Sequence, residues 1–282
     1  MIPRRYFAIP HLLRCIVLAA LSLTAEYQAA KADDFSLVWS SKFDTPLNVR
    51  QWNVYNNTNF SSSANTCFQG ANAYTKDNFL YLAIDTSQNK CNLKYSASGL
   101  DTHTSQIRIF GKWEVRARFP KAYGTTGYIG LFVDDNSIWP PEIDFAEVTG
   151  KEPQKLYLTQ HYGTGTKPQE VGIALTQPGV DWTEDYHTFT LEWVPGRLSY
   201  YVDGVLRLTQ SQMFAAIPQK MKLAIGTGAG NCGSWVDCPE NAPANLTNRS
   251  LPTSLSVQYV KIYQYNPLSP KTYCLDQSGH KC

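Results

Sequence analysis

Three acidic residues lie close together in the stretch EIDFAE, at residues 142–147. Glu142 and Asp144 are two positions apart, so they share one face if the stretch is a β-strand, whereas Glu147 falls on the opposite face. A β-bulge at Phe145–Ala146 would add one residue to the strand and return Glu147 to the face of the other two. We therefore predict a bulged strand that presents three carboxylates in one row.

A row of carboxylates on one surface suits the hydrolysis of a glycosidic bond. With the bulge, Glu142 and Glu147 lie ~13 Å apart along the strand, and side chains that lean together bring the carboxyl groups to ~5 Å. Retaining glycosidases hold a nucleophile and an acid/base ~5–5.5 Å apart, whereas inverting enzymes need a wider gap for water. The acid must keep its proton near neutral pH, which neighbouring negative charge promotes by raising its pKa. Asp144, between the two glutamates, can hydrogen-bond the nucleophile and couple their titrations.

Alternating acidic residues on a strand are also typical of a solvated face that does no chemistry. Two neighbours favour chemistry here. Trp139 in the preceding IWPP places an indole beside the acids, where it could stack on a sugar ring, and the two prolines fix the start of the strand. The local residues alone leave both interpretations open.

Strands with alternating apolar and polar residues surround the acidic stretch and must position it. In KWEVRARF, residues 112–119, apolar and charged residues alternate, and 186–193, 197–204 and 255–264 show the same period. Turn residues separate these stretches, and no long stretch has a helical period. The pattern predicts an all-β protein, an antiparallel β-sandwich forming one domain over residues 33–282.

The first 32 residues have the features of a secretory signal peptide. A basic segment precedes an apolar run of about a dozen residues, too short to span a membrane, and AKA at 30–32 offers a cleavage site. Its removal leaves 21 Lys and Arg against 22 Asp and Glu. Such a balance gives no strong attraction to nucleic acid or to an anionic membrane. We expect a secreted protein, extracellular or periplasmic, and its charge permits an uncharged ligand.

Six cysteines remain beyond the predicted signal peptide, in three pairs that are close in sequence. An even number in an exported chain favours disulfides, and the simplest pairing is Cys67–Cys91, Cys232–Cys238 and Cys274–Cys282, the last tying a short C-terminal tail. Six cysteines allow fifteen connectivities, so the pairing stays open. A zinc site is the competing interpretation, but there is no C-x₂-C pair and the histidines are scattered.

Several segments resemble, in order along the chain, the glycoside hydrolases of family 16. They are GKWEVRARFP, WPPEIDFAEVTG, LTQHYG, YHTFTLEWVPGRLSYYVDGV, MKLAIGTG and VQYVKIYQ. The resemblance implies a sandwich of the jelly-roll type, concanavalin A-like, with a long sugar-binding cleft and double-displacement hydrolysis. It also implies that Glu142 is the nucleophile, Asp144 its electrostatic helper and Glu147 the general acid/base.

The extra residue in E-x-D-x-x-E distinguishes branches of that family. Lichenases of the Bacillus type and xyloglucan transglycosylases carry E-x-D-x-E, whereas laminarinase-like enzymes, agarases and carrageenases carry the longer form. We therefore predict a retaining endo-β-glucanase that cuts β-1,3- or mixed β-1,3-1,4-glucan. The alternatives are a transglycosylase, a hydrolase of galactan or a bacterial exopolysaccharide, and a jelly roll that binds glycan without cutting it.

Four further residues are candidates for contact with the sugar chain. Trp139 precedes the acids, and His161 falls where the family places a polar residue facing the cleft, although a sheet histidine with only a hydrogen-bonding role would fit too. Trp235 lies in the loop between Cys232 and Cys238 and could stack on a sugar or anchor the loop. Tyr128 stands where laminarinases carry a tryptophan, which predicts different glycan contacts.

No cofactor is expected. GAGNCG at 228–233 matches G-x-G-x-x-G, but the residues that follow do not predict a helix, so a dinucleotide site is not indicated. The family is known to hold a structural Ca²⁺, for which the sequence identifies no ligands. The expected partner is a polysaccharide, and we expect a monomer without membrane association once the signal is cleaved.

Overall fold

The computed structural model describes residues 34–59, 65–213, 219–246 and 250–267. All of them belong to one compact unit, Ala32–Cys282. The predicted signal peptide and the predicted pair Cys274–Cys282 lie outside the described residues. In the described part of the chain, no helix is long and apolar enough to cross a membrane.

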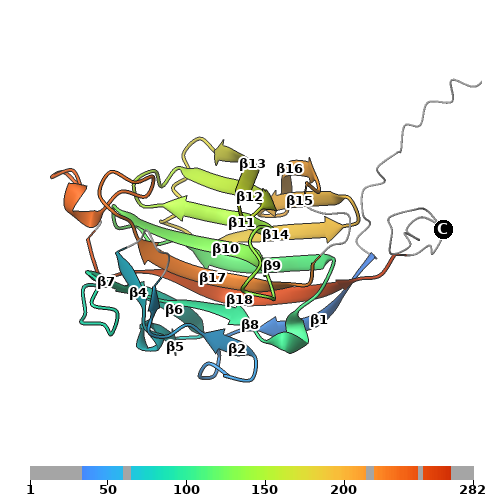
Figure 1. Cartoon of the computed structure of the whole chain (residues 1–282), viewed down its shortest axis with the longest axis horizontal. Coiled ribbons are helices and arrows are strands. Elements are labelled where there is room, and N and C mark those ends of the chain that lie inside the picture. The colour runs from blue at the N-terminus through green and yellow to red at the C-terminus, as the bar shows by residue number, and fades with distance from the viewer. Residues whose placement is uncertain (1–33, 60–64, 214–218, 247–249, 268–282) are drawn as a thin grey trace, which may run out of the picture. The chain divides into compact units, whose positions relative to one another are not determined.

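Two large antiparallel sheets form the described unit, so the all-β prediction is confirmed (Figure 1). The eight-stranded sheet has the order β16-β15-β14-β9-β18-β6-β5, with β1 also paired to β18. Its strands are β1 (Phe35–Ser41), β5 (Ala73–Lys76), β6 (Phe79–Ile84), β9 (Gly111–Arg118), β14 (His187–Val194), β15 (Arg197–Val202), β16 (Val205–Ser211) and β18 (Thr253–Tyr265).

The seven-stranded sheet has the order β13-β12-β11-β10-β17-β8-β2 and contains the acidic stretch as β11. Its strands are β2 (Trp52–Val54), β8 (Gly99–Thr102), β10 (Thr125–Val133), β11 (Glu142–Thr149), β12 (Lys155–Thr164), β13 (Lys167–Thr176) and β17 (Met221–Ala229). A small third sheet joins β3 (Thr58–Asn59), β4 (Thr66–Phe68) and β7 (Tyr95–Ala97). Three short 3₁₀ turns complete the described elements: Gly70–Asn72, Thr104–Gln106 and Pro239–Asn241.

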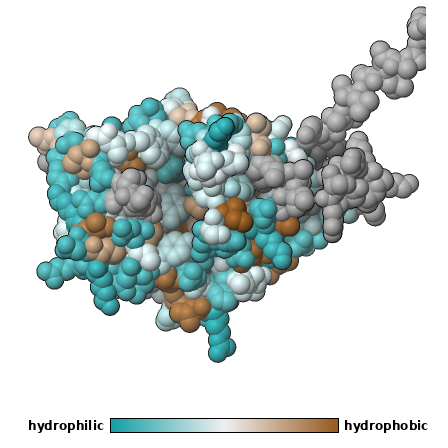
Figure 2. All heavy atoms as spheres, viewed as in Figure 1, coloured by the Kyte–Doolittle hydropathy of each residue, from teal (hydrophilic) through white to brown (hydrophobic). Residues whose placement is uncertain are grey.

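The core forms between the two large sheets because each strand alternates its side chains. On β9, Trp113, Val115 and Ala117 are fully buried, as the predicted alternation requires. They belong to one continuous cluster with Ile129 and Leu131 of β10 in the other sheet. On the side shown in Figure 2, hydrophilic residues cover most of the surface and apolar ones are scattered between them.

One hairpin turn and two disulfides form where the sequence predicts them. The β15–β16 hairpin turns through Asp203 and Gly204, which both have positive φ (51° and 76°), as a two-residue hairpin turn of type I′ needs. The predicted pairs Cys67–Cys91 and Cys232–Cys238 are confirmed, with Cα–Cα distances of 5.8 and 4.5 Å.

Candidate active site

The register between β10 and β11 confirms the predicted bulge. Tyr128 pairs with Glu147, Gly130 with Asp144 and Phe132 with Glu142, so equal steps on β10 face unequal steps on β11. The extra residue is Phe145, which is buried in the core. Because paired residues share a face, the three carboxylates stand in one row on the face of the sheet that points away from the core. We call this the outer face of the seven-stranded sheet.

Glu142 has an indole as its hydrogen-bond donor. Trp139 Nε1 donates to Glu142 Oε2 at 2.5 Å. Burial, and next the charge of Asp144, raise the pKa of Glu142 well above its usual value, and the hydrogen bond from Trp139 acts in the opposite direction. The Trp139 side chain remains 44% exposed, so one surface of this predicted sugar contact is open to a ligand.

His161 of β12 lies on the same outer face, opposite Glu142 in the register. Its Nε2 is 3.3 Å from Asp144 Oδ2, and its Nδ1 is 3.6 Å from Glu170 Oε2. Burial lowers the pKa of His161, but the hydrogen bond with Asp144 and the two carboxylate charges outweigh burial and raise it. His161 is thus positioned to balance the charge of the buried Asp144.

One atom each of Glu142, Asp144 and His161 lies within 4.8 Å of the others. Two carboxylates and an imidazole are a ligand set that a divalent cation could use. A cation bound there would compete with the hydrogen bonds that Trp139 and His161 make to the same carboxylates.

Glu147 lies at the other end of the row. Burial, and next the charge of Asp144, raise its pKa well above the usual value, while a hydrogen bond with Thr126 partly opposes the shift. Tyr157 of β12 is its neighbour in the register, and Trp235 packs edge-on against Tyr157 with ring centroids 5.0 Å apart. The Tyr157 ring therefore lies between Trp235 and Glu147. Trp235 is 45% exposed, so this predicted stacking residue is open to a ligand.

Two glycines, one on β10 and one on β17, leave space for side chains of the site. A Cβ on Gly130 would lie 2.6 Å from Asp144 Oδ1, so only glycine leaves space for this carboxylate. A Cβ on Gly226 would overlap the hydroxyl end of Tyr128, which shows that the Tyr128 ring lies over β17. Tyr128 thus forms part of the outer face beside Glu147, the surface on which its predicted contact with substrate would lie.

A second charged group on the outer face was not anticipated from the sequence. Lys222 Nζ is 3.0 Å from Asp101 Oδ2 and donates to Asn136 Oδ1 at 2.8 Å. Tyr55 donates its hydroxyl to the same Asp101 oxygen at 2.9 Å. The available signal was the alternation in MKLAIG, because Lys222 falls between the buried Met221 and Leu223 and so must face outward.

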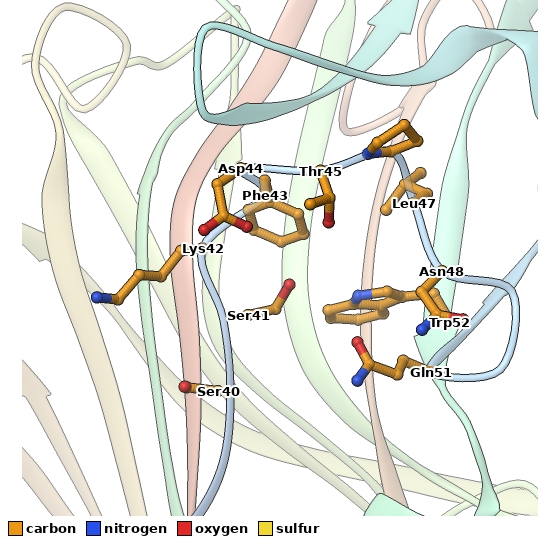
Figure 3. A pocket seen from close by; sticks show the side chains of 11 residues that line it. Ser40, Ser41, Lys42, Phe43, Asp44, Thr45, Leu47, Asn48, Gln51 and Trp52 are labelled. Atoms are coloured by element: carbon orange, nitrogen blue, oxygen red, sulfur yellow. The ribbon is translucent and has the colours of Figure 1, made fainter.

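A separate pocket lies where the chain passes from β1 to β2 (Figure 3). It has a volume of about 240 Å³ and is lined by Ser40–Asn48, Gln51 and Trp52. Asp44 supplies the one carboxylate among these lining residues. The pocket therefore lacks the paired acids that glycosidic chemistry needs.

Comparison with known proteins agrees with the geometry of the outer face. The profile of the family described as Glycosyl hydrolases family 16 matches residues 60–244. The chain is 25% identical over 250 residues to a keratan-sulfate endo-1,4-beta-galactosidase of Sphingobacterium multivorum, covering 82% of this chain and 56% of the relative. It is 26% identical to a glucan endo-1,3-beta-glucosidase of Cryptopygus antarcticus, covering 62% of this chain and 69% of that enzyme. The chain thus spans little more than half the length of the first relative.

Solved structures show the same fold. The catalytic domain of an endo-1,3-beta-glucanase (laminarinase) from Thermotoga petrophila superposes with a TM-score of 0.68 at 22% identity, covering 83% of this chain and 99% of that domain. The family profile spans the region that carries the bulged row of acids, and the sandwich is of the jelly-roll type expected from the sequence. On these grounds the chain belongs to glycosyl hydrolases family 16.

Proposed function

We propose that this glycoside hydrolase is a retaining endo-β-glucanase that cuts β-1,3- or mixed β-1,3-1,4-glucan by double displacement. The observation that carries the proposal is the bulged strand β11, which places Glu142, Asp144 and Glu147 on one face. Strand geometry with one bulge gives the two glutamates a carboxyl separation of ~5 Å, which suits a covalent intermediate.

The family resemblance assigns the two glutamates different roles, and the hydrogen bond and burial around each are compatible with those roles. In the first step Glu142 attacks the anomeric carbon while Glu147 gives its proton to the departing glycosidic oxygen. In the second step Glu147 takes a proton from water, and that water releases the sugar from the Glu142 ester. The indole N–H of Trp139 stabilises the ionised form of Glu142, as a nucleophile requires. Burial and the Asp144 charge keep a proton on Glu147, as an acid requires.

Charge on the outer face supports a neutral polymer. Carboxylates outnumber cationic groups around β11, so a sulfated or carboxylated chain would be repelled. The carboxylates are Asp101, Asp144, Glu170 and the nucleophile Glu142, because Glu147 holds its proton, and the cationic groups that contact them are Lys222 and His161. A glucan fits this balance better than the sulfated polymer named for the Sphingobacterium multivorum relative.

Two exposed indoles supply stacking surfaces for such a polymer. Trp139 lies beside Glu142, and Trp235 packs on Tyr157, the neighbour of Glu147. The two rings therefore lie at opposite ends of the row of acids, where each offers a surface on which a sugar ring can stack. Tyr128 and His161 complete the proposed contacts on the outer face.

Release of reducing ends from laminarin, barley glucan, agarose, carrageenan and keratan sulfate tests the proposal, with Glu142→Gln as the control. We expect release from laminarin or barley glucan, none from the variant, and retention of configuration in the first product observed by proton NMR. Release from keratan sulfate or a galactan alone would overturn the glucan assignment. An inverted first product would overturn the role of Glu142 as nucleophile. Longer products at high acceptor concentration would indicate a transglycosylase.

We also infer that residues 1–32 are removed during export, which leaves one domain over 33–282 with its tail tied by Cys274–Cys282. The basic, apolar and small-residue segments at the start of the sequence support this inference. Mass spectrometry of the exported protein tests it through the mass of the mature N-terminus. Light scattering of the same sample tests the expected monomer.

A further inference from the structure

We propose that Lys222 and Asp101 form a subsite that binds hydroxyl groups of a neutral sugar away from the cut bond, and so determines chain-length preference and the bond that is cut. The inference rests on the proposed function, because it assigns a substrate contact on the same outer face. Nothing in the sequence motif of β11 implies it.

The register places the pair at a defined distance from the acids. Lys222 pairs with Phe132, which pairs with Glu142. The backbone of Lys222 is therefore two strand spacings, or ~10 Å, from the strand that carries the row of acids. Asp101 pairs with Ala224, which leads through Gly130 to Asp144, a distance of three strand spacings or ~14 Å. The pair therefore contacts a sugar further along the polymer than the one that reacts.

The hydrogen bonds of the pair are incomplete in a way that suits hydroxyl groups. An ammonium has three donors, and the described residues supply Lys222 with two acceptors, Asp101 and Asn136. Both contacts to Asp101, from Lys222 and Tyr55, reach Oδ2, and no described residue donates to Oδ1. One N–H donor and one carboxylate acceptor thus stand side by side, and adjacent sugar hydroxyls can accept from the first and donate to the second.

Stability alone does not explain this ion pair. Lys222 is 6% exposed and Asp101 3% exposed, so both charges have lost most of their hydration. Desolvation of a buried pair commonly offsets its attraction, and apolar residues of similar volume are often at least as stabilising. A role in binding gives the pair a reason to occupy the face that also carries the acids.

Aromatic rings lie beside the pair. Tyr55 lies over Gly99, where a Cβ would be 2.8 Å from the ring, and Tyr128 lies over Gly226, which pairs with Gly99 in the register. These rings offer an apolar floor for a sugar whose hydroxyls reach Lys222 and Asp101. Because the ammonium and the carboxylate cancel in charge, the subsite favours a neutral sugar over a sulfated one.

The test compares the wild type with the double variant Lys222→Met/Asp101→Leu, which removes both groups without leaving a buried charge. The matched control is Lys261→Met/Glu114→Leu, which removes an ion pair of 2.8 Å from the other large sheet. The substrates are aryl β-laminari-oligosaccharides of increasing length and end-labelled laminarihexaose. In the wild type and the control, we expect kcat/KM to rise with chain length.

In the Lys222/Asp101 variant we expect the rise in kcat/KM with chain length to shrink by about tenfold, because one or two hydrogen bonds to charged groups are lost. We also expect the cut in laminarihexaose to move to another bond. The proportional loss should be smaller on the shortest cleaved substrate than on the longest. Ratios within one preparation are independent of the folded fraction, and Lys222→Gln provides a second, shape-conserving variant.

An unchanged length dependence, or an equal loss on all lengths, would overturn the subsite. A wild type that cleaves no β-glucan would instead refute the proposed function, so the two failures are distinguishable.

Discussion

At the scale of single residues, the site depends on small groups that set the ionisation of two buried glutamates. Burial, and next the charge of Asp144, raise the pKa of both, and one hydrogen bond opposes the shift in each, from Trp139 at Glu142 and with Thr126 at Glu147. The indole N–H is thus the contact through which the ionisation of the proposed nucleophile can be altered while the proposed acid keeps its own hydrogen bond.

Replacing Trp139 with Phe keeps an aromatic ring but removes the donor to Glu142. The pKa of Glu142 should then rise, so the nucleophile loses its charge at a higher pH. We expect the acidic limb of the kcat/KM profile to move up by about one pH unit, the equivalent of one hydrogen bond to a charged group. Trp235→Phe is the control, and its acidic limb should not move. Reduced activity with an unmoved limb in Trp139→Phe would show that the indole serves only as a sugar platform.

Gly130→Ala tests how closely Asp144 is held. The added methyl would sit 2.6 Å from Asp144 Oδ1, so the carboxylate must shift from its position. We expect kcat to fall about a hundredfold, as misplacement of a catalytic group by ~1 Å can cause. Gly70→Ala is the control, since its Cβ would meet its nearest neighbour at 3.4 Å. Wild-type kcat in Gly130→Ala would contradict a role for the position of Asp144.

At the scale of elements, the loop that carries Trp235 is held by the side chain of Asp237 in addition to the Cys232–Cys238 disulfide. Asp237 Oδ1 accepts hydrogen bonds from the backbone N–H groups of Gly233 and Cys238 and from the Asn241 side chain. These donors hold the pKa of Asp237 well below its usual value. A carboxylate with a lowered pKa stabilises the fold above its unfolded-state pKa, and that contribution is lost as pH falls through the folded-state pKa.

Asp237→Ala should therefore loosen the loop at neutral pH and move Trp235 away from Tyr157. We expect KM for polymeric glucan to rise several-fold and kcat to change little, because the acids on β11 are untouched. Hydrogen exchange of residues 231–241 should increase in the same variant. Asp203→Ala, which alters a hairpin turn elsewhere, is the control and should leave KM unchanged. A fall in kcat without a change in KM would contradict the positioning role.

At the scale of the whole molecule, the two described disulfides differ in the length of chain they close. Cys67–Cys91 spans 24 residues and Cys232–Cys238 spans 6. The loop-entropy relation predicts a loss of ~3 kcal/mol for the first and ~2 kcal/mol for the second when each pair is replaced by alanine. Urea unfolding of the two double variants measures this difference. Equal losses, or a larger loss for the shorter loop, would show that local contacts dominate.

The sequence predicted what depends on local pattern, and the structure was needed for what depends on register. The strand period, the bulge at Phe145 and the two neighbouring cysteine pairs all follow from residues close in the chain. The pairing of Asp101 with Lys222, and the placement of Tyr128 over Gly226, require knowing that β17 lies between β10 and β8. Strand order is set by the whole core, so no short pattern could supply it.

That strand order has a consequence for how the chain reaches its native state. β17 fills the gap between β10 and β8, and β18 fills the gap between β9 and β6, so each large sheet lacks a central strand until the last quarter of the chain exists. During synthesis the strands made earlier have unpaired edges, because the strands that will lie between them have not yet been made. Pairings between segments so distant in sequence form slowly, and the open edges are prone to aggregation meanwhile. The emerging polypeptide therefore cannot complete its sandwich until Thr253–Tyr265 has been made.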